Sequence, residues 1–310
     1  MAAKRVGVRR DAGKPQPELF GKEFHQKAQS AMEYLMTYGW AILIIAVVLG
    51  ALFQLGIFNA SNFAPRAQAG SCQVVKNAEA GGVTVASLEG LCNGQLPGYV
   101  MQDNGQCCSS YVSVPASSAS MPSADFSISA WVYTNPTTNW GTIFETNAFD
   151  FEKQGSNGVI LRFIWGNGNL NTNTGIPNNV WTSVIVTRSG GFGYLYINGA
   201  PVLSGVTVGA NIIAINGIRI GAAGLSGLGG IDTWWGSLAN IQFYNASLSA
   251  TEANATYSGG IGGAPVRPQN LVGWWPLNGN ANDYSGNNNN GAATSVTYTS
   301  AWTNQYSGPV

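Results

Sequence analysis

The stretch FGYLYINGAPV, residues 192–202, decides the fold class of this chain. The dipeptide Asn198-Gly199 stands between two segments rich in residues that favour strands. Asn-Gly suits a two-residue turn in which both residues have positive φ, and such a turn joins antiparallel strands. We therefore predict a β-hairpin that turns at Asn198 and Gly199.

Further strand patterns lie on both sides of this hairpin. Residues 126–133 (FSISAWVY) and 181–188 alternate apolar and polar side chains, and residues 158–165 are rich in β-branched and aromatic residues. Shorter candidates cover 217–221 and 235–244. Many short strands with frequent turn signals predict an all-β antiparallel sandwich.

The order of these pieces resembles a laminin-G-like, concanavalin A-type jelly roll over residues 111–260. The resemblance rests on YVSVP, FSISAWVY, the strand at 181–188, LYINGAPV, IRIG and GSLANIQFYNASLSATE. The tetrapeptide from Ser249 to Glu252 has the pattern of a capping box and fits the short helix that follows the last strand in that family. The resemblance implies binding of glycans or proteins, in some members through calcium.

The segment LVGWWPLNGNANDYSGNNNNG, residues 271–291, resembles a segment that normally precedes such a module. Here it follows the module, and the 40 residues from Leu271 onward are too few for a second sandwich. We expect this segment to return to the same sandwich as an edge strand, which gives a domain over residues 111–310. A truncated, loosely attached repeat is the alternative.

The N-terminal region contains a long uncharged run, residues 34–58, within KAQSAMEYLMTYGWAILIIAVVLGALFQLGIF. A helix over this run would be roughly 37 Å long, enough to cross a membrane core of about 30 Å. Residues 1–28 hold seven basic and three acidic residues, which predicts a cytoplasmic N-terminus and an exported remainder. We expect a transmembrane helix over residues 29–58.

The order of Lys27, Ala28, Gln29 and the acid Glu33 before this run resembles the class III signal peptide of archaeal type IV pilins. The resemblance implies that a prepilin peptidase cuts between Ala28 and Gln29 and removes residues 1–28. It also implies self-association of the helix over residues 29–58 into a filament, with Glu33 paired to the new amino terminus of a neighbouring subunit. Ser30 and Glu33 also fit a capping box, and the two roles are compatible.

Four cysteines, Cys72, Cys92, Cys107 and Cys108, lie in residues 59–110, for which we expect an irregular, cross-linked neck with few strand signals beyond residues 82–86. An even number of cysteines in an exported segment predicts two disulfides. A bond between the adjacent Cys107 and Cys108 would be strained, so Cys72 and Cys92 should each pair with one of them. A four-thiolate zinc site is the alternative, but its usual C-x-x-C spacing is absent.

Composition excludes several functions. Without residues 1–28 the chain keeps 7 Lys and Arg (14 minus 7) and 11 Asp and Glu (14 minus 3), with no basic run to bind nucleic acid. The single histidine, His25, lies in the expected leader, so the mature chain lacks the residues of a Ser-His-Asp site. Glycosylation sequons begin at Asn59, Asn245 and Asn254.

Three acids offer a comparison with hydrolases of similar fold. Glu145, Asp150 and Glu152 occur in FETNAFDFEKQ, but the E-x-D-x-x-E pattern of such enzymes is absent. Asp150 and Glu152 share a strand face at roughly 7 Å, whereas retaining hydrolysis needs carboxyl groups about 5 to 5.5 Å apart. We therefore expect solvated acids near a strand end and assign no catalytic residue.

Binding is the favoured function for the head. Tryptophan rings suit the CH faces of sugars, and the candidates are Trp140, Trp234, Trp235, Trp274 and Trp275. In each adjacent pair we expect one ring inside and one outside. Asp232 and Asp283 lie in loops where carboxylates can bind calcium, although lone loop acids are more often solvated.

The sequence thus predicts a subunit of an archaeal type IV pilus-like surface filament with an exposed head for adhesion or for glycan or protein binding. The subunit would sit in the cytoplasmic membrane before assembly and at the cell surface afterwards. The alternative is a singly anchored lectin-like surface protein that does not polymerise. An exported glycoside hydrolase ranks third.

Overall fold

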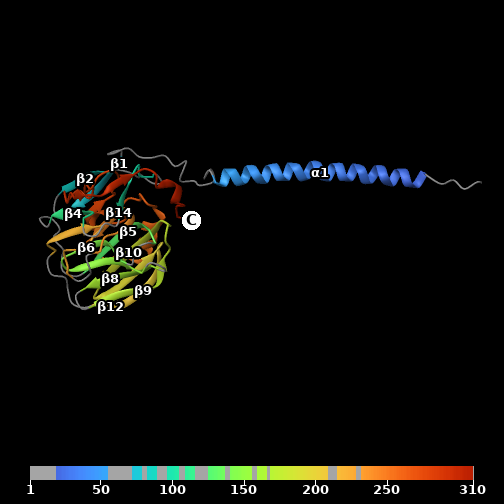
Figure 1. Cartoon of the computed structure of the whole chain (residues 1–310). Coiled ribbons are helices and arrows are strands. Elements are labelled where there is room, and N and C mark those ends of the chain that lie inside the picture. The colour runs from blue at the N-terminus through green and yellow to red at the C-terminus, as the bar shows by residue number, and fades with distance from the viewer. Residues whose placement is uncertain are drawn as a thin grey trace, which may run out of the picture. The chain divides into compact units, whose positions relative to one another are not determined.

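A computed structural model describes residues 19–54, 72–78, 82–88, 96–104, 109–115, 125–136, 140–155, 159–165, 168–208, 215–227 and 232–309 (Figure 1). The chain divides into two compact units, residues 1–58 and residues 59–310. The second unit, here called the head, contains two large antiparallel β-sheets and one small one.

The first large sheet has eight strands, and it provides the face on which the candidate site lies. Its main path runs in the order β12 (Ala200–Thr207), β11 (Phe192–Ile197), β10 (Thr182–Ser189), β5 (Phe126–Thr134), β14 (Trp235–Tyr244), β3 (Val100–Asn104) and β17 (Thr297–Thr299). The eighth strand, β15 (Leu271–Trp275), pairs with the second half of β14.

The second large sheet has seven strands. They follow the order β16 (Ala292–Thr294), β4 (Tyr111–Pro115), β13 (Gly217–Ile220), β6 (Trp140–Thr146), β7 (Phe149–Gln154), β8 (Val159–Trp165) and β9 (Gly168–Ile176). A separate hairpin consists of β1 (Cys72–Ala78) and β2 (Gly82–Leu88). The predicted all-β antiparallel sandwich is confirmed.

The core lies between the two large sheets because alternate side chains of each strand point inward. Phe126 of β5 stacks on Phe149 of β7 with ring centroids 5.0 Å apart, and Phe144 of β6 lies 5.2 Å from Phe243 of β14. All four rings are buried. Aromatic contacts between the sheets therefore join the two layers at their centre.

Two local predictions are confirmed. The turn between β11 and β12 has φ of 49° at Asn198 and 74° at Gly199, as the Asn-Gly pattern requires. Helix α2 (Ala250–Ser258) begins with a capping box in which Ser249 and Glu252 exchange hydrogen bonds. Two short 3₁₀-helices, Pro268–Asn270 and Thr303–Gln305, follow later in the chain.

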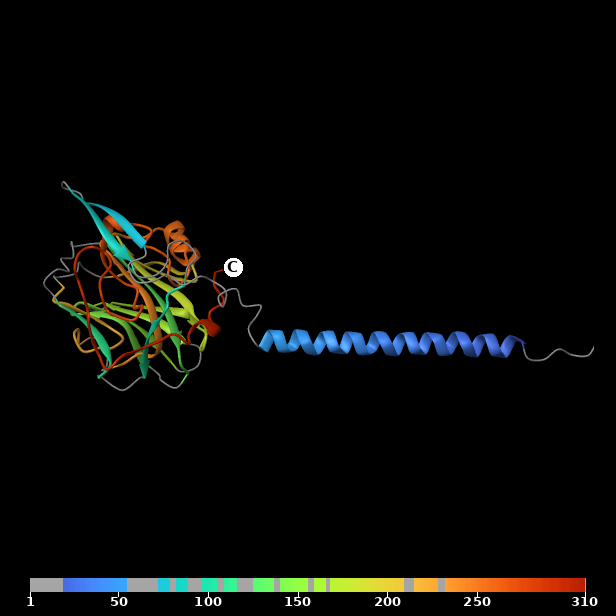
Figure 2. The same ribbon diagram turned by 90° about the horizontal axis from the view of Figure 1, so that it is seen from above.

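The C-terminal segment returns to the sandwich and supplies strands to both sheets. Besides β15, the strand β16 pairs with β4 in one sheet and β17 pairs with β3 in the other. Figures 1 and 2 show this segment, coloured orange to red, running back over the earlier strands. The expected edge strand is therefore present, and the segment adds two more strands than the sequence predicts.

The neck region differs from the irregular segment that we expected. It contains the β1–β2 hairpin, and its last part is β3, which lies inside the eight-stranded sheet between β14 and β17. The sandwich thus starts at Val100 rather than at Tyr111. Cys92, Cys107 and Cys108 lie outside the described residues, as does the side chain of Cys72, so the two disulfides stay a prediction.

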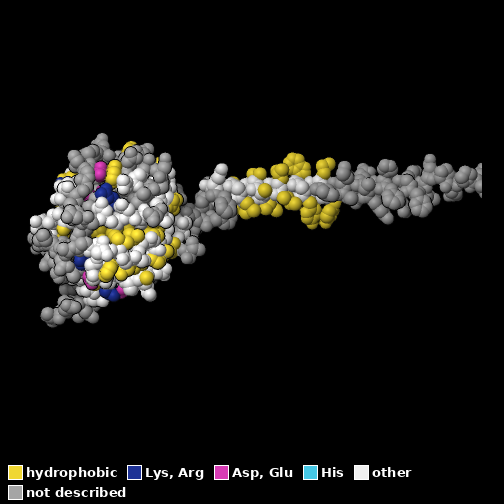
Figure 3. All heavy atoms as spheres, turned by 90° about the horizontal axis from the view of Figure 1, so that it is seen from below, with side chains coloured by type: hydrophobic (Ala, Val, Ile, Leu, Met, Phe, Trp, Pro, Cys, Tyr) yellow, Lys and Arg dark blue, Asp and Glu magenta, His cyan; other side chains and the backbone are white. Residues whose placement is uncertain are grey.

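Helix α1 (Leu19–Gln54) belongs to the first unit and passes without interruption through the expected cleavage boundary. Ser30 lies inside this helix, which places the tetrapeptide up to Glu33 away from a helix start. Large apolar side chains from Tyr34 to Leu49 are exposed by 46–67%, and Figure 3 shows them around the helix. No helix within the described residues has the length and hydropathy of a membrane span, so the transmembrane assignment is not supported.

Candidate functional site

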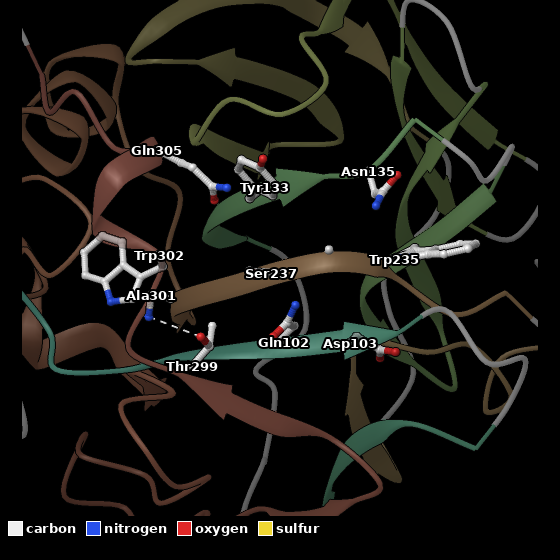
Figure 4. Close-up of a pocket in the computed structure, with 11 residues that line it drawn as sticks. Gln102, Asp103, Tyr133, Asn135, Trp235, Ser237, Thr299, Ala301, Trp302 and Gln305 are labelled. Atoms are coloured by element: carbon white, nitrogen blue, oxygen red, sulfur yellow. Dashed lines mark hydrogen bonds between the residues drawn. The ribbon is translucent and has the colours of Figure 1, made fainter. Parts of the chain in front are cut away.

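A pocket of about 300 Å³ lies on the face of the eight-stranded sheet that points away from the core (Figure 4). Eleven residues line it: Gln102, Asp103, Tyr133, Asn135, Trp235, Gly236, Ser237, Thr299, Ala301, Trp302 and Gln305. They come from β3, β5, β14 and β17 and from the residues directly after β5 and β17.

The strand register brings the floor of the pocket together. Ser237 of β14 pairs with Tyr133 of β5 on one side and with Gln102 of β3 on the other. Their neighbours Met101, Val132 and Leu238 belong to the buried core. Because successive side chains alternate between faces, Gln102, Tyr133 and Ser237 form a polar row on the outer face.

Aromatic and C-terminal residues form the walls of the pocket. Trp235 is half-buried, and the Tyr133 ring lies 5.7 Å from that of Trp181. Burial raises the pKa of Tyr133, so its hydroxyl stays protonated and can donate a hydrogen bond at neutral pH. Trp302 and Gln305 reach the pocket from the segment after β17, where the Ala301 amide donates to Thr299 Oγ1 at 3.2 Å.

The lining has the chemistry of a site for an uncharged polar molecule. Carboxamides of Gln102, Asn135 and Gln305 can both donate and accept hydrogen bonds. The lining contains no Lys, Arg or His, and its one acid, Asp103, is buried with its carboxylate toward Gly221, which follows β13 of the other sheet. Arginine is the usual partner of a bound carboxylate or phosphate, so this lining favours hydroxyl-rich, neutral ligands over anionic ones.

Of the five predicted tryptophans, only Trp235 lines the pocket. Trp234 is fully buried, as expected for one member of a pair. Trp275 belongs to the core between the two large sheets, whereas Trp274 belongs to a second cluster with Leu248 and Ala253, so the two rings face opposite ways as expected. Both are nevertheless buried, because Leu248, Ala253 and their neighbours cover Trp274. Trp140 is half-buried outside the pocket, with the Arg162 guanidinium 5.5 Å from its ring.

The loop acid Asp283 has a structural role. Its carboxylate accepts four hydrogen bonds at 2.8–2.9 Å, from the amides of Trp274, Ser285 and Asn289 and from the Ser285 hydroxyl. These bonds fold the Asn-rich loop onto β15. Asp232 is half-buried, and burial raises its pKa. Among the described residues there is no group of three or more His, Cys, Asp or Glu side chains able to hold a metal ion.

The three acids of the hydrolase comparison are buried rather than solvated. Glu145 accepts hydrogen bonds from the amides of Leu225 and Ser226, both at 2.8 Å, and from the Ser226 hydroxyl. Glu152 pairs with Arg162 at 3.1 Å. Asp150 accepts a bond from the Thr142 hydroxyl at 3.5 Å. The expectation of solvated acids is therefore wrong: all three are buried, with Leu225 and Ser226 against Glu145 and Arg162 against Glu152.

Burial also changes the protonation of these acids. It raises the pKa of Asp150 well above its ordinary value, and the neighbouring Glu152 and Glu145 carboxylates add to this effect. Burial raises the pKa of Glu152 to about 7, against the opposing effect of Arg162. Neither carboxylate has exposed surface, so a sugar polymer does not reach them in this structure.

The other predicted site residues lie away from the pocket. Asn254 is exposed on α2, and Asn245 is half-buried with its side-chain oxygen bonded to Asn270 at 3.0 Å. Asn59 lies outside the described residues. Lys27, Ala28, Gln29 and Glu33 belong to α1, whose side chains are not described at these positions.

The pocket residues that the sequence analysis missed are mainly polar ones and a C-terminal tryptophan. Tyr133 ends the predicted strand FSISAWVY, and its outward alternation could have identified it. Gln102 and Trp302 carried no such signal. Gln102 lies in the short strand β3, whose partner β17 comes almost two hundred residues later in the sequence, and Trp302 lies beyond the end of β17.

Residues 104–254 match the model of the concanavalin A-like lectin/glucanases superfamily. No protein of curated function matches the chain. The predicted concanavalin A-like domain is thus confirmed for these residues. The matched region covers none of residues 1–103, so the pilin-like signal segment stays a prediction.

Among the solved structures with a similar chain is one that has a TM-score above 0.5 and supports the fold. A protein from Bacteroides ovatus, to which carbohydrate binding has been ascribed, shares 17% identity at a TM-score of 0.51, over 70% of this chain and 66% of that protein, just under two thirds of its length. The heptameric SAP-like pentraxin of Limulus polyphemus shares 18% sequence identity at a TM-score of 0.48. The match covers 64% of this chain and 93% of the pentraxin chain. The CBM40 of a Ruminococcus gnavus sialidase, bound to α2,3-sialyllactose, shares 14% sequence identity at a TM-score of 0.38. The match covers 50% of this chain and 96% of the CBM40. At these identities the likeness concerns the fold alone.

Proposed function

Since residues 104–254 form a concanavalin A-like domain, we propose that the head is a lectin-like module that binds neutral glycans in the pocket on the eight-stranded sheet. The observation that carries this proposal is the row of Tyr133, Ser237 and Gln102 beside the half-buried ring of Trp235. A sugar offers hydroxyl groups to the polar row and CH groups to the ring. The module binds without turnover, because the buried acids Asp150 and Glu152 lie apart from this pocket.

The test is a binding assay of the full-length chain against neutral oligosaccharides and their sialylated counterparts, with and without calcium. We expect binding to neutral members, a loss of at least tenfold in affinity for Trp235→Ala, and a similar loss for Gln102→Ala. Trp140→Ala is the matched control because it removes a half-buried indole outside the pocket, and it should leave affinity unchanged.

Three other results would contradict this reading. Preference for sialylated members would exclude a neutral site. Equal losses in Trp235→Ala and Trp140→Ala would place the site elsewhere. Release of sugar that disappears in both Asp150→Ala and Glu152→Ala would establish hydrolysis in place of binding alone.

The exposed apolar surface of α1 favours a second role. Consecutive large side chains such as Ile42, Leu43, Ile44 and Ile45 point in all directions around a helix, and each is more than half exposed. Such a helix is stable only when an apolar environment surrounds it. We propose that copies of α1 associate into the core of a surface filament after a prepilin peptidase removes residues 1–28, and that the heads carry out glycan binding at the cell surface.

Two measurements separate the filament from a singly anchored lectin. Mass spectrometry of surface-sheared protein should find a mature chain that begins at Gln29, and protein that retains His25 would contradict the cleavage. Glu33→Gln should abolish filaments while it leaves glycan binding intact, because the head is a separate unit. Normal filaments from this variant would leave Glu33 without a role in assembly.

A further inference from the structure

Lys153 of β7 is a fully buried lysine that the proposed binding function does not yet use. Its side chain crosses the core from the seven-stranded sheet to the end of β5 in the other sheet. There its ammonium donates to Thr134 Oγ1 at 2.6 Å and to the Asn135 carbonyl oxygen at 3.2 Å. The ammonium also lies 5.5 Å from the centre of the Trp234 ring.

The backbone that Lys153 contacts is the one that carries the pocket. Tyr133 and Asn135 both line the pocket and flank Thr134. The Asn135 amide donates to the Trp235 carbonyl oxygen at 2.9 Å, which joins the end of β5 to the start of β14. The Trp234 indole, which packs under the lysine, donates to the Tyr133 carbonyl oxygen at 3.2 Å. Lys153 and Trp234 therefore fix three consecutive residues of the pocket rim from behind.

Packing alone does not explain a lysine at this position. Burial of an ammonium group is costly, and among the described residues no carboxylate forms an ion pair with Lys153. Burial accordingly lowers the pKa of Lys153 to about 8. Replacement of a buried charge by an apolar side chain of similar volume is often neutral or stabilising, so methionine would serve the core at least as well.

The local structure also leaves space for this side chain. Gly141 lies opposite Lys153 in the register of β6 and β7. A methyl group at position 141 would lie 3.2 Å from Lys153 Cε and 3.3 Å from Trp234, closer than nearly all such contacts. The glycine therefore permits the lysine and the indole to pack together behind the pocket.

We propose that Lys153 is a positioning residue for the glycan pocket: its ammonium orients the Tyr133–Asn135 backbone so that the side chains of Tyr133, Asn135 and Trp235 face a bound sugar. This proposal rests on the proposed function of the same pocket. Lys153 itself does not touch the ligand, because it is fully buried behind the backbone.

The test compares full-length wild type with Lys153→Met and with Thr134→Val, which removes one of the two acceptors. The probe is the neutral oligosaccharide that the wild type binds most tightly. Each variant is measured for affinity, for thermal unfolding and for hydrogen exchange at the Asn135 amide. Arg188→Met is the matched control, because Arg188 is another almost fully buried cation and lies outside the pocket lining.

We expect Lys153→Met to lose at least tenfold in affinity and to exchange the Asn135 amide at least fivefold faster, with an unfolding temperature equal to or above that of wild type. Thr134→Val should show smaller changes in the same direction, and Arg188→Met should keep wild-type affinity and Asn135 exchange. Wild-type affinity and exchange in Lys153→Met would overturn the proposal. The proposal would also be overturned if every variant that loses affinity is also destabilised, because the loss of affinity would then reflect unfolding of the head.

The two proposals fail in different ways. If wild type binds no probe, the proposed glycan function fails. The exchange measurement then still decides the role of Lys153: faster exchange in a stable Lys153→Met variant supports positioning of the rim, and unchanged exchange refutes it. If wild type binds and Lys153→Met binds equally well, only the positioning role fails.

Discussion

At the scale of residues, the buried acids make stability depend on pH in an unusual direction. The pKa of Glu152 is about 7 in the folded chain, above its ordinary value of 4.5, and the pKa of Asp150 is raised as well. Between pH 4.5 and 7 the folded state therefore keeps protons that the unfolded state has released. The contribution of these two acids to stability is therefore greatest below this window and falls as pH rises through it.

The measurement is urea unfolding at pH 5 and pH 7.5. We expect a higher midpoint at pH 5 for wild type. Glu152→Gln should show a weaker dependence, because a neutral amide then lies beside Arg162 at both pH values. Equal midpoints at the two pH values in wild type would show that Glu152 titrates normally.

Asp283 offers a second prediction at the residue scale. Asp283→Ala removes the acceptor of four hydrogen bonds from the Asn-rich loop and β15, and we expect it to cost about 3 kcal/mol in the free energy of unfolding. Asn282→Ala, an exposed neighbour, should change it by less than about 0.5 kcal/mol. A large gain in stability on addition of calcium to wild type would contradict the structural role and indicate a cation site instead.

At the scale of elements, the segment after β17 stabilises the outer face of the eight-stranded sheet. Trp302 is buried with its ring 5.9 Å from Trp181 and 5.7 Å from Tyr306, and Tyr306 in turn accepts a bond from the Ile261 amide. We expect Trp302→Ala to cost about 3–5 kcal/mol. Gln305→Ala in the same 3₁₀-helix is the control for stability, and similar losses in both variants would indicate a general effect of the segment.

The elements that the sequence predicts well are those with local signals. The Asn198-Gly199 turn and the capping box at Ser249 each depend on a few adjacent residues, so their structure follows from their own chemistry. β3 was missed because VMQDN is short and its pairing partners, β14 and β17, lie more than a hundred residues away. The burial of Glu145 was missed for the same reason, since Leu225 and Ser226, which bond to it, lie about eighty residues later in the chain.

The candidate site shows the same division. Trp235 was one of five tryptophans predicted to bind because indole rings suit the CH faces of sugars, and it is the one of the five that lines the pocket. The polar partners Gln102 and Asn135 have no special spacing, and only the strand order brings them beside Trp235. Residues of a site on a sheet face are adjacent across strands rather than along the sequence, so their combination requires the topology.

At the scale of the whole molecule, the four cysteines provide a test outside the described residues. We predict two disulfides that join Cys72 and Cys92 to Cys107 and Cys108, each worth about 3 kcal/mol in chain-entropy models. Reduction should therefore lower the unfolding temperature of the native protein. Mass spectrometry of alkylated protein should find no free thiols, and free thiols or bound zinc in a one-to-one ratio would refute the pairing.

The return of the last strands to both sheets has a consequence for the biogenesis of the protein. A ribosome completes β3 and β4 early, yet their partners β17 and β16 are made almost two hundred residues later. Until then the outer sides of β3 and β4 carry unpaired backbone groups. Contacts of such sequence separation form slowly. The two sheets of the head are therefore completed only after nearly the whole polypeptide has been synthesised.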